Sequence, residues 1–277
     1  MNFTKMHGLG NDYVVINCFK ENIINPSKLA IDMGNRHFGI GSDGLLLISR
    51  SLVADCKMTM YNPDGTEGEM CGNGIRCVAK FAYEKGITNK KDMNIETKSG
   101  IKNVKLHIKG SIVEEVEVNM GTPILTPKEI PICNDITDIK NIPVNIDEKT
   151  YNVTAISMGN PHGVVFVDDI YSIDIEKIGQ LLENSVLFPK KANIEFAHCI
   201  ERNGIEARVW ERGVGETLAC GTGACAILVA SVLNGYTDLK ANIKLAGGDL
   251  TVEWKDKKEV ILAGRANFVF EGNWNLE

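Results

Sequence analysis

The sequence CGNG at residues 71–74 recurs as CGTG at residues 220–223, and an apolar segment with helical spacing follows each stretch. The two cysteines lie 149 positions apart (220 − 71 = 149), and the same offset joins Asn11 to Asn160 and Gly86 to Gly235. We interpret this single long offset as two related halves that arose by internal duplication. Two such halves are expected to face each other across a cleft, a common location for a small-molecule site.

The segments around the repeated stretches predict the α+β class. Residues 104–108, 113–118 and 250–254 alternate apolar and polar side chains, which is typical of half-solvated strands. A helix is expected after Cys71, ending at Gly86, and a second at residues 224–233, which are apolar nearly all round. The simplest arrangement that buries such a helix is a strand-rich half wrapped around it.

Bulk composition limits the classes of function. The chain has 277 residues, 44% hydrophobic and 24% charged, with a net charge of −6 and scattered basic residues. This pattern argues against a nucleic-acid or membrane partner. There is no apolar signal sequence at the N-terminus, so we expect a cytoplasmic protein whose eight cysteines are reduced, and their spacing does not favour a metal site.

A cysteine immediately before a helix is in a chemically special position. The unpaired N–H groups and the positive end of the helix dipole favour a thiolate there and can hold a carboxylate. If the halves face each other, Cys71 and Cys220 flank one anion site, which suits proton removal and return on opposite faces of a carbon beside a carboxylate. No metal or pyridoxal phosphate is needed. The N–H groups expected to hold the carboxylate belong to Gly72, Asn73, Gly221 and Thr222.

Each candidate also has a purely structural interpretation. A free cysteine is often an inert core residue, and the repeat is what favours catalysis for this pair. Arg212 could clamp a second carboxylate, and Glu211 could take an ammonium group or tune a thiol, or the two could form a solvated surface pair. His162 could modulate a cysteine. Asparagines next to glycine or proline usually shape turns, but the repeat raises the interest of Asn11 and Asn160.

An ordered set of motifs along almost the whole chain resembles the diaminopimelate epimerase family of lysine and peptidoglycan biosynthesis. The motifs are KMHGLGND at residues 5–12, NRHFGIG at 35–41, CGNG at 71–74, MGNPH at 158–162, ERG at 211–213 and CGTGAC at 220–225.

This resemblance implies two pseudo-symmetric domains, each a β-barrel-like sheet around a central helix, with the active site in the cleft. The domains would be residues 1–120 plus about 266–277, and residues 121–265. It further implies a homodimer that interconverts LL- and meso-diaminopimelate without a cofactor, with Cys71 and Cys220 as the two bases. Cys220 would be the base toward the LL isomer, and His162 and Glu211 would tune the thiols. The implied substrate contacts are Asn11, Asn62, Gly72, Asn73, Asn160, Asn193, Glu211, Arg212, Gly221 and Thr222.

The chain departs from the family pattern at Gly44, where many members carry a substrate-contacting glutamine. Two other functions stay open. One is a racemase of another amino acid, resembling proline racemase, which would not need Arg212 for a distal carboxylate. The other is a non-catalytic small-molecule-binding or thiol-redox protein that uses the same cleft.

Overall fold

The structure is a computed structural model that describes residues 1–68 and 71–275. The chain divides into two compact units: Met1–Asn119 together with the C-terminal segment from Ala263, and Met120–Leu262. Leu276 and Glu277, the end of the predicted terminal segment, lie outside the described residues.

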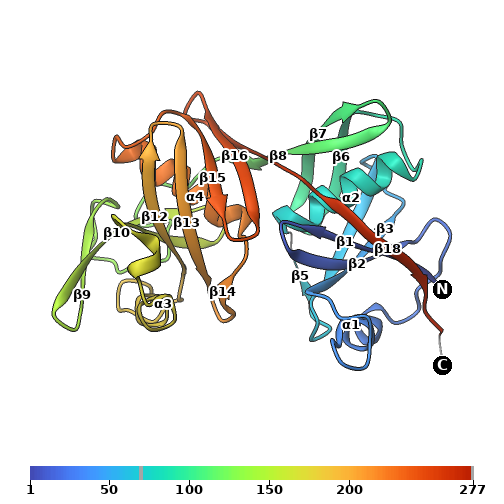
Figure 1. Ribbon diagram of the computed structural model, residues 1–277, viewed down its shortest axis with the longest axis horizontal. Helices are drawn as coiled ribbons and strands as arrows, with labels where there is room; N and C mark the ends of the chain where they lie inside the picture. The colour runs from blue at the N-terminus through green and yellow to red at the C-terminus, as the bar shows by residue number, and fades with distance from the viewer. Residues whose placement is uncertain (69–70, 276–277) are drawn as a thin grey trace. The chain divides into compact units, whose positions relative to one another are not determined.

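The first unit contains most of the elements from the N-terminal half and the last strand of the chain (Figure 1). These are β1 (Asn2–Gly8), β2 (Asn11–Asn17), α1 (Pro26–Gly34), β3 (Gly44–Ser49), β4 (Cys56–Tyr61), β5 (Glu67–Gly68), α2 (Gly72–Glu84), β6 (Asp92–Thr97), β7 (Gly100–Lys109), β8 (Ile112–Gly121) and β18 (Asn267–Asn273).

The elements of the second unit are β9 (Ile142–Ile146), β10 (Lys149–Ser157), β11 (Pro161–Phe166), the 3₁₀ helix η1 (Ile170–Ser172), α3 (Ile175–Glu183), β12 (Asn193–Glu201), β13 (Gly204–Glu211), β14 (Gly215–Thr217), α4 (Gly221–Leu233), β15 (Lys240–Leu245), β16 (Gly248–Lys255) and β17 (Glu259–Gly264). In this unit, β10 to β17 with α3 and α4 repeat the order of β1 to β8 with α1 and α2, and β9 and η1 are additional.

Strand pairing in the two units follows one topology. Strand β2 pairs with β3 in parallel and β3 with β4 antiparallel, and β11, β12 and β13 are paired in the same way. The register also agrees, because Tyr13 lies opposite Gly44 as His162 lies opposite Asn193, each partner shifted by 149 positions. The predicted α+β class and the pseudo-symmetry are confirmed.

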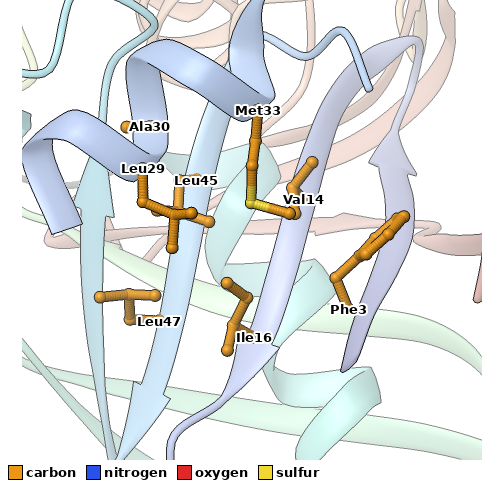
Figure 2. Packing of buried hydrophobic residues seen from close by; sticks show 8 residues of the cluster. All are labelled: Phe3, Val14, Ile16, Leu29, Ala30, Met33, Leu45 and Leu47. Atoms are coloured by element: carbon orange, nitrogen blue, oxygen red, sulfur yellow. The ribbon is translucent and has the colours of Figure 1, made fainter. Parts of the chain in front are cut away.

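Helix α1 and helix α2 cover opposite faces of the first sheet. Figure 2 shows Leu29, Ala30 and Met33 of α1 against alternate residues of the strands, namely Phe3, Val14, Ile16, Leu45 and Leu47. The intervening residues of β2 and β3 face α2, since a side chain at Gly74 would touch Leu46 and Tyr13. Both faces are covered, so these strands are continuously apolar rather than alternating.

Helix α2 starts and stops where the sequence predicts, and α4 ends at the predicted residue but begins three residues before residue 224, at Gly221. Both begin directly after a cysteine and end before a glycine with positive φ, 72° at Gly86 and 77° at Gly235. Glycine adopts this left-handed conformation without steric cost, which allows the chain to close each helix and turn back. Helix α4 is buried on nearly all sides, as its apolar composition requires.

Two features were not predicted from the residue pattern. Each unit has a second helix, α1 or α3, which packs on the outer face of the sheet, whereas one central helix per half was expected. Both helices are only nine residues long, although Ile175, Ile178 and Leu182 of α3 recur with helical spacing and are buried. Strand β18 pairs with β1, so the chain's last strand (dark red in Figure 1) lies alongside its first (blue).

Candidate functional site

Cys71 is the residue immediately before helix α2. Its backbone is extended, with φ −128° and ψ 126°, and the helix that follows is buried from Gly72 through Ala82. The first N–H groups of any helix have no carbonyl partner four residues earlier, so the positive end of the helix lies beside this thiol. The side chain of Cys71 is half-buried.

The Cys71 sulfur lies within a small polar cluster contributed by β2 and α2. Tyr13 Oη is 2.9 Å from Cys71 Sγ, and Asn11 Oδ1 is 3.7 Å from it. Asn11 Oδ1 also accepts hydrogen bonds from the Tyr13 hydroxyl and, over 3.3 Å, from Asn73 Nδ2. Three predicted site residues of this half, Asn11, Cys71 and Asn73, therefore lie together.

A charged network fixes the orientation of the Asn11 amide. Asn11 Nδ2 donates to Asp43 Oδ2 over 2.8 Å, which leaves Oδ1 directed at the Cys71 cluster. Arg36 Nη2 lies 2.7 Å from both Asp43 Oδ1 and Asp12 Oδ1. Burial disfavours the charged form of Asp12, but hydrogen bonds from Arg36 and Lys5 outweigh it and lower the pKa of Asp12 to about 2.

Cys220 occupies the equivalent position before helix α4. Its sulfur accepts a hydrogen bond from Gly223 N over 3.3 Å and lies 3.5 Å from Thr222 Oγ1. Unlike Cys71, Cys220 is buried. The thiol therefore caps its own helix and is held against the first turn.

A line of hydrogen bonds connects Cys220 to a buried carboxylate. His162 Nδ1 is 2.7 Å from Glu195 Oε1, and both side chains are inaccessible to solvent. His162 Nε2 is 3.1 Å from Asn160 Oδ1, and Asn160 Nδ2 donates to Thr222 Oγ1 over 3.3 Å. Thr222 then reaches the sulfur, so the predicted residues Asn160, His162, Cys220 and Thr222 lie in one network.

The expectation that a helix start lowers the thiol pKa is wrong for Cys220. Burial raises the pKa of Cys220 well above its usual value, and the nearby carboxylates of Glu211 and Glu195 raise it further. Hydrogen bonds from Thr222 and Gly223 oppose this rise but do not offset it. Loss of hydration at a fully buried sulfur outweighs the favourable helix end.

Arg212 and Asn193 form a second group in this unit. Arg212 N donates to Asn193 Oδ1 over 2.9 Å, and Asn193 Nδ2 donates to Pro161 O over 3.4 Å. The guanidinium of Arg212 is exposed and donates to Lys190 O over 3.2 Å. Asn193 thus holds the backbone that carries Arg212. The neighbouring Glu211 accepts a hydrogen bond from Thr217 Oγ1 over 2.6 Å.

Asn62 lies in the turn that follows β4. Its side-chain Nδ2 donates to Thr66 Oγ1 over 3.0 Å, and its backbone N donates to Thr66 O. In the structure this predicted substrate contact stabilises its own turn, at the position equivalent to Glu211 in the other unit.

Gly44 sits where a side chain has no room. A Cβ atom there would lie 2.9 Å from the backbone oxygen of Tyr61 and 3.4 Å from the Tyr13 ring. Because Tyr61 contributes a backbone atom, it cannot simply rotate away. The absence of glutamine at this position is therefore matched by close packing against the Tyr61 backbone.

Tyr13 and Glu195 are among the residues of these clusters that were missed from the sequence. Tyr13 is the 149-offset partner of His162, so the offset that identified Asn11 and Asn160 could have identified Tyr13 as well. Glu195 is a carboxylate between Ile194 and Phe196 in a buried strand. A charge at such a position is costly without a partner. A lone carboxylate in an apolar strand is therefore a sequence signal for a functional or paired residue.

Among the described residues, no group of three or more histidine, cysteine or acidic side chains is arranged to hold a metal ion. The described helices include none of the length and hydrophobicity required to traverse a bilayer.

Comparison with known proteins gives consistent results. The diaminopimelate epimerase family model matches residues 3–126 and 154–269. Diaminopimelate epimerases from Acetivibrio thermocellus and Methanococcus maripaludis are 53% and 50% identical, and each match covers the whole chain and 99% or 100% of the relative. A crystal structure of a probable proline racemase from Agrobacterium radiobacter has a TM-score of 0.72 at 14% identity, covering 100% of this chain and 93% of that one. That similarity concerns the fold.

Replacing Glu195 with glutamine should make Cys220 more reactive at lower pH. The substitution removes a buried negative charge that raises the pKa of Cys220, so the thiolate should form at a lower pH than in the unmodified protein. The measurement is the alkylation rate of Cys220 by iodoacetamide as a function of pH, followed by peptide mass spectrometry. Glu201→Gln, at the exposed end of the same strand, is the matched control. An unchanged or higher midpoint for Glu195→Gln would contradict this role for the carboxylate.

Proposed function

The chain belongs to the diaminopimelate epimerase family, and on that premise we propose that it interconverts LL- and meso-2,6-diaminopimelate. The proposed reaction is an inversion at one α-carbon and serves the biosynthesis of lysine and peptidoglycan precursors. The observation that supports it best is the equivalent placement of Cys71 and Cys220, each immediately before the central helix of its unit.

In the proposed mechanism the two half-sites meet around one substrate. One thiolate removes the α-proton, and the electron pair of the broken C–H bond delocalises into the adjoining carboxylate. The thiol on the opposite face then donates its proton to the carbon and becomes the thiolate. The first-turn N–H groups of Gly72, Asn73, Gly221 and Thr222 are assigned to the carboxylate, where helix ends stabilise the charge that develops.

This scheme balances without a metal ion or pyridoxal phosphate. The proton that one sulfur takes from the carbon is replaced by a proton that the other sulfur gives to it. Burial raises the pKa of Cys220, so the thiol form of Cys220 is favoured. That form is the acid for the direction that starts from the meso isomer. Reaction from the LL isomer uses Cys220 as the base, and we expect the substrate ammonium group to offset the carboxylates of Glu211 and Glu195.

The remaining predicted contacts are assigned to the groups that flank the reacting carbon and to the distal end of the substrate. Arg212 offers an exposed guanidinium on a backbone that Asn193 holds, which suits the distal carboxylate. Glu211 is assigned to an ammonium group and to tuning of Cys220, and His162 acts on the thiols through Asn160. Asn11, Asn62 and Asn160 complete the proposed contacts. We also propose a homodimer located in the cytoplasm.

The reaction is tested by incubating reduced protein with LL-diaminopimelate in deuterated water. We expect deuterium at the α-carbon and formation of the meso isomer, measured by NMR and mass spectrometry. Cys71→Ala and Cys220→Ala should each abolish inversion while circular dichroism shows a retained fold. If neither isomer gains α-deuterium, the proposed function is contradicted, and substantial inversion by either alanine variant would contradict the two-base scheme.

Arg212→Ala should lower kcat/KM for diaminopimelate about 100-fold, because a charge-assisted hydrogen-bond pair to the distal carboxylate is lost. Arg202→Ala removes an arginine that pairs with Asp238 on the surface of the same unit and serves as the control. A value of kcat/KM for Arg212→Ala equal to that of the control would remove Arg212 from the substrate site.

A further inference from the structure

We propose that the Tyr13 hydroxyl is a switchable hydrogen-bond partner of Cys71, accepting from the thiol and donating to the thiolate as Cys71 changes its protonation state. The role of Tyr13 rests on the proposed function, since it serves the sulfur that exchanges a proton with substrate. Tyr13 acts through Cys71 and is a positioning residue.

The geometry that carries this inference is a phenol oxygen placed between two partners. Tyr13 Oη lies 2.9 Å from Cys71 Sγ and also donates to Asn11 Oδ1. A hydroxyl has one proton and can also accept, so both contacts can be satisfied in two ways. When Cys71 is a thiol, S–H donates to Tyr13 Oη, which is closer to the sulfur than Asn11 Oδ1 at 3.7 Å, and the hydroxyl proton goes to Asn11. When Cys71 is a thiolate, the hydroxyl turns its proton to the sulfur.

The hydrogen bond from Tyr13 to Asn11 can be broken at low free-energy cost. Asn11 Oδ1 accepts a second hydrogen bond from Asn73 Nδ2 over 3.3 Å, so the oxygen keeps a partner when the hydroxyl turns away. Asn11 Nδ2 is held by Asp43 over 2.8 Å, so the amide does not rotate with the hydroxyl. The switch therefore requires only rotation about the Tyr13 C–O bond.

Tyr13 keeps its own proton throughout. Its side chain is fully buried, and burial raises the pKa of Tyr13 well above its usual value, with a further rise from the neighbouring Cys71. The phenol is therefore a donor or acceptor of hydrogen bonds at neutral pH rather than a base. The proton that leaves Cys71 goes to the substrate carbon, and the sulfur retains the electron pair.

The other ionisable groups around Tyr13 and Cys71 come from helix α2 and from the segment before β3, where Asp43 also joins the network of Arg36, Asp12 and Lys5. Helix α2 brings Cys77 and Arg76, and the segment before β3 brings Asp43. Burial raises the pKa of Cys77 to about 12, so it stays a thiol. Arg76 is engaged with Gly72 O and Asn73 Oδ1, and Asp43 with Asn11 and Arg36. Tyr13 is thus the residue of this described group whose side chain contacts Cys71 Sγ, at 2.9 Å.

Glycines lie beside the Tyr13 ring on both β3 and α2. Gly44 lies opposite Tyr13 in the strand pair, and a Cβ there would lie 3.4 Å from the ring. A Cβ at Gly74 on α2 would lie 3.6 Å from Tyr13 Cζ, the carbon that bears the hydroxyl. Tyr13 thus packs beside Gly44, the position where the family pattern has glutamine.

The two units use different residues at this position. His162, the equivalent of Tyr13, contacts Glu195 and Asn160, and is linked to Cys220 through Asn160 and Thr222. Leu46 stands where the second unit has Glu195. Cys71 therefore has a direct neutral donor, whereas Cys220 is next to buried negative charge.

Tyr13→Phe removes the hydroxyl and keeps the ring. We expect the pH midpoint for alkylation of Cys71 by iodoacetamide to rise by about one unit, equivalent to a roughly tenfold loss of thiolate at a fixed pH below it. Peptide mass spectrometry separates Cys71 from the other cysteines. Tyr83→Phe, the same change near the end of helix α2, should leave the midpoint unchanged. Equal midpoints for Tyr13→Phe and the unmodified protein, with unchanged thermal unfolding, would overturn the proposal.

Alkylation needs no substrate, so it separates this inference from the proposed function. A shifted midpoint in a protein that does not epimerise diaminopimelate would support the hydrogen bond and refute the reaction. If Tyr13→Phe does not fold, infrared spectroscopy of the unmodified protein below the alkylation midpoint provides the test. The S–H band that disappears in Cys71→Ser should lie at the frequency of a hydrogen-bonded thiol. A band at the frequency of a free thiol would overturn the proposal.

Discussion

The start of the buried central helix is the constraint on which each unit depends. A helix packed against a sheet has to begin close to the neighbouring strands. Its first N–H groups then face the side chains at the ends of those strands. In both units these side chains are a cysteine at the position before the helix and an asparagine at a strand end. The architecture that buries the helix thus places a thiol and amide groups together at its positive end.

Shared architecture does not give the two thiols the same environment. Cys220 is buried, is close to the carboxylates of Glu211 and Glu195, and has a raised pKa. Cys71 is only half-buried and is in contact with the hydroxyl of Tyr13. The proposed two-base reaction needs one thiol and one thiolate at any moment. We infer that Tyr13 in the first unit and His162 in the second, which occupy equivalent strand positions, help to distinguish the two sulfurs.

Much of this arrangement follows from sequence. The 149-residue offset located both central helices and the pairing of Asn11 with Asn160, because glycine turns and apolar runs are local signals. It did not give the raised pKa of Cys220, since burial and a carboxylate from a distant strand are tertiary effects. Asn193 supports Arg212 through the Arg212 backbone, a contact that no residue pattern encodes. Helices α1 and α3 are short and were missed, although the apolar spacing of Ile175, Ile178 and Leu182 in α3 is a usable signal.

The central claim is that two different sulfurs act on opposite faces of one carbon. It is tested most directly by starting the reaction with either pure isomer in deuterated water and analysing both isomers before a few per cent has turned over. Two bases predict that the newly formed isomer carries deuterium at the inverted carbon while the recovered starting isomer keeps its hydrogen. A single base that both removes and returns the proton would give equal labelling of the two isomers, or product that retains the original hydrogen, and would contradict the account.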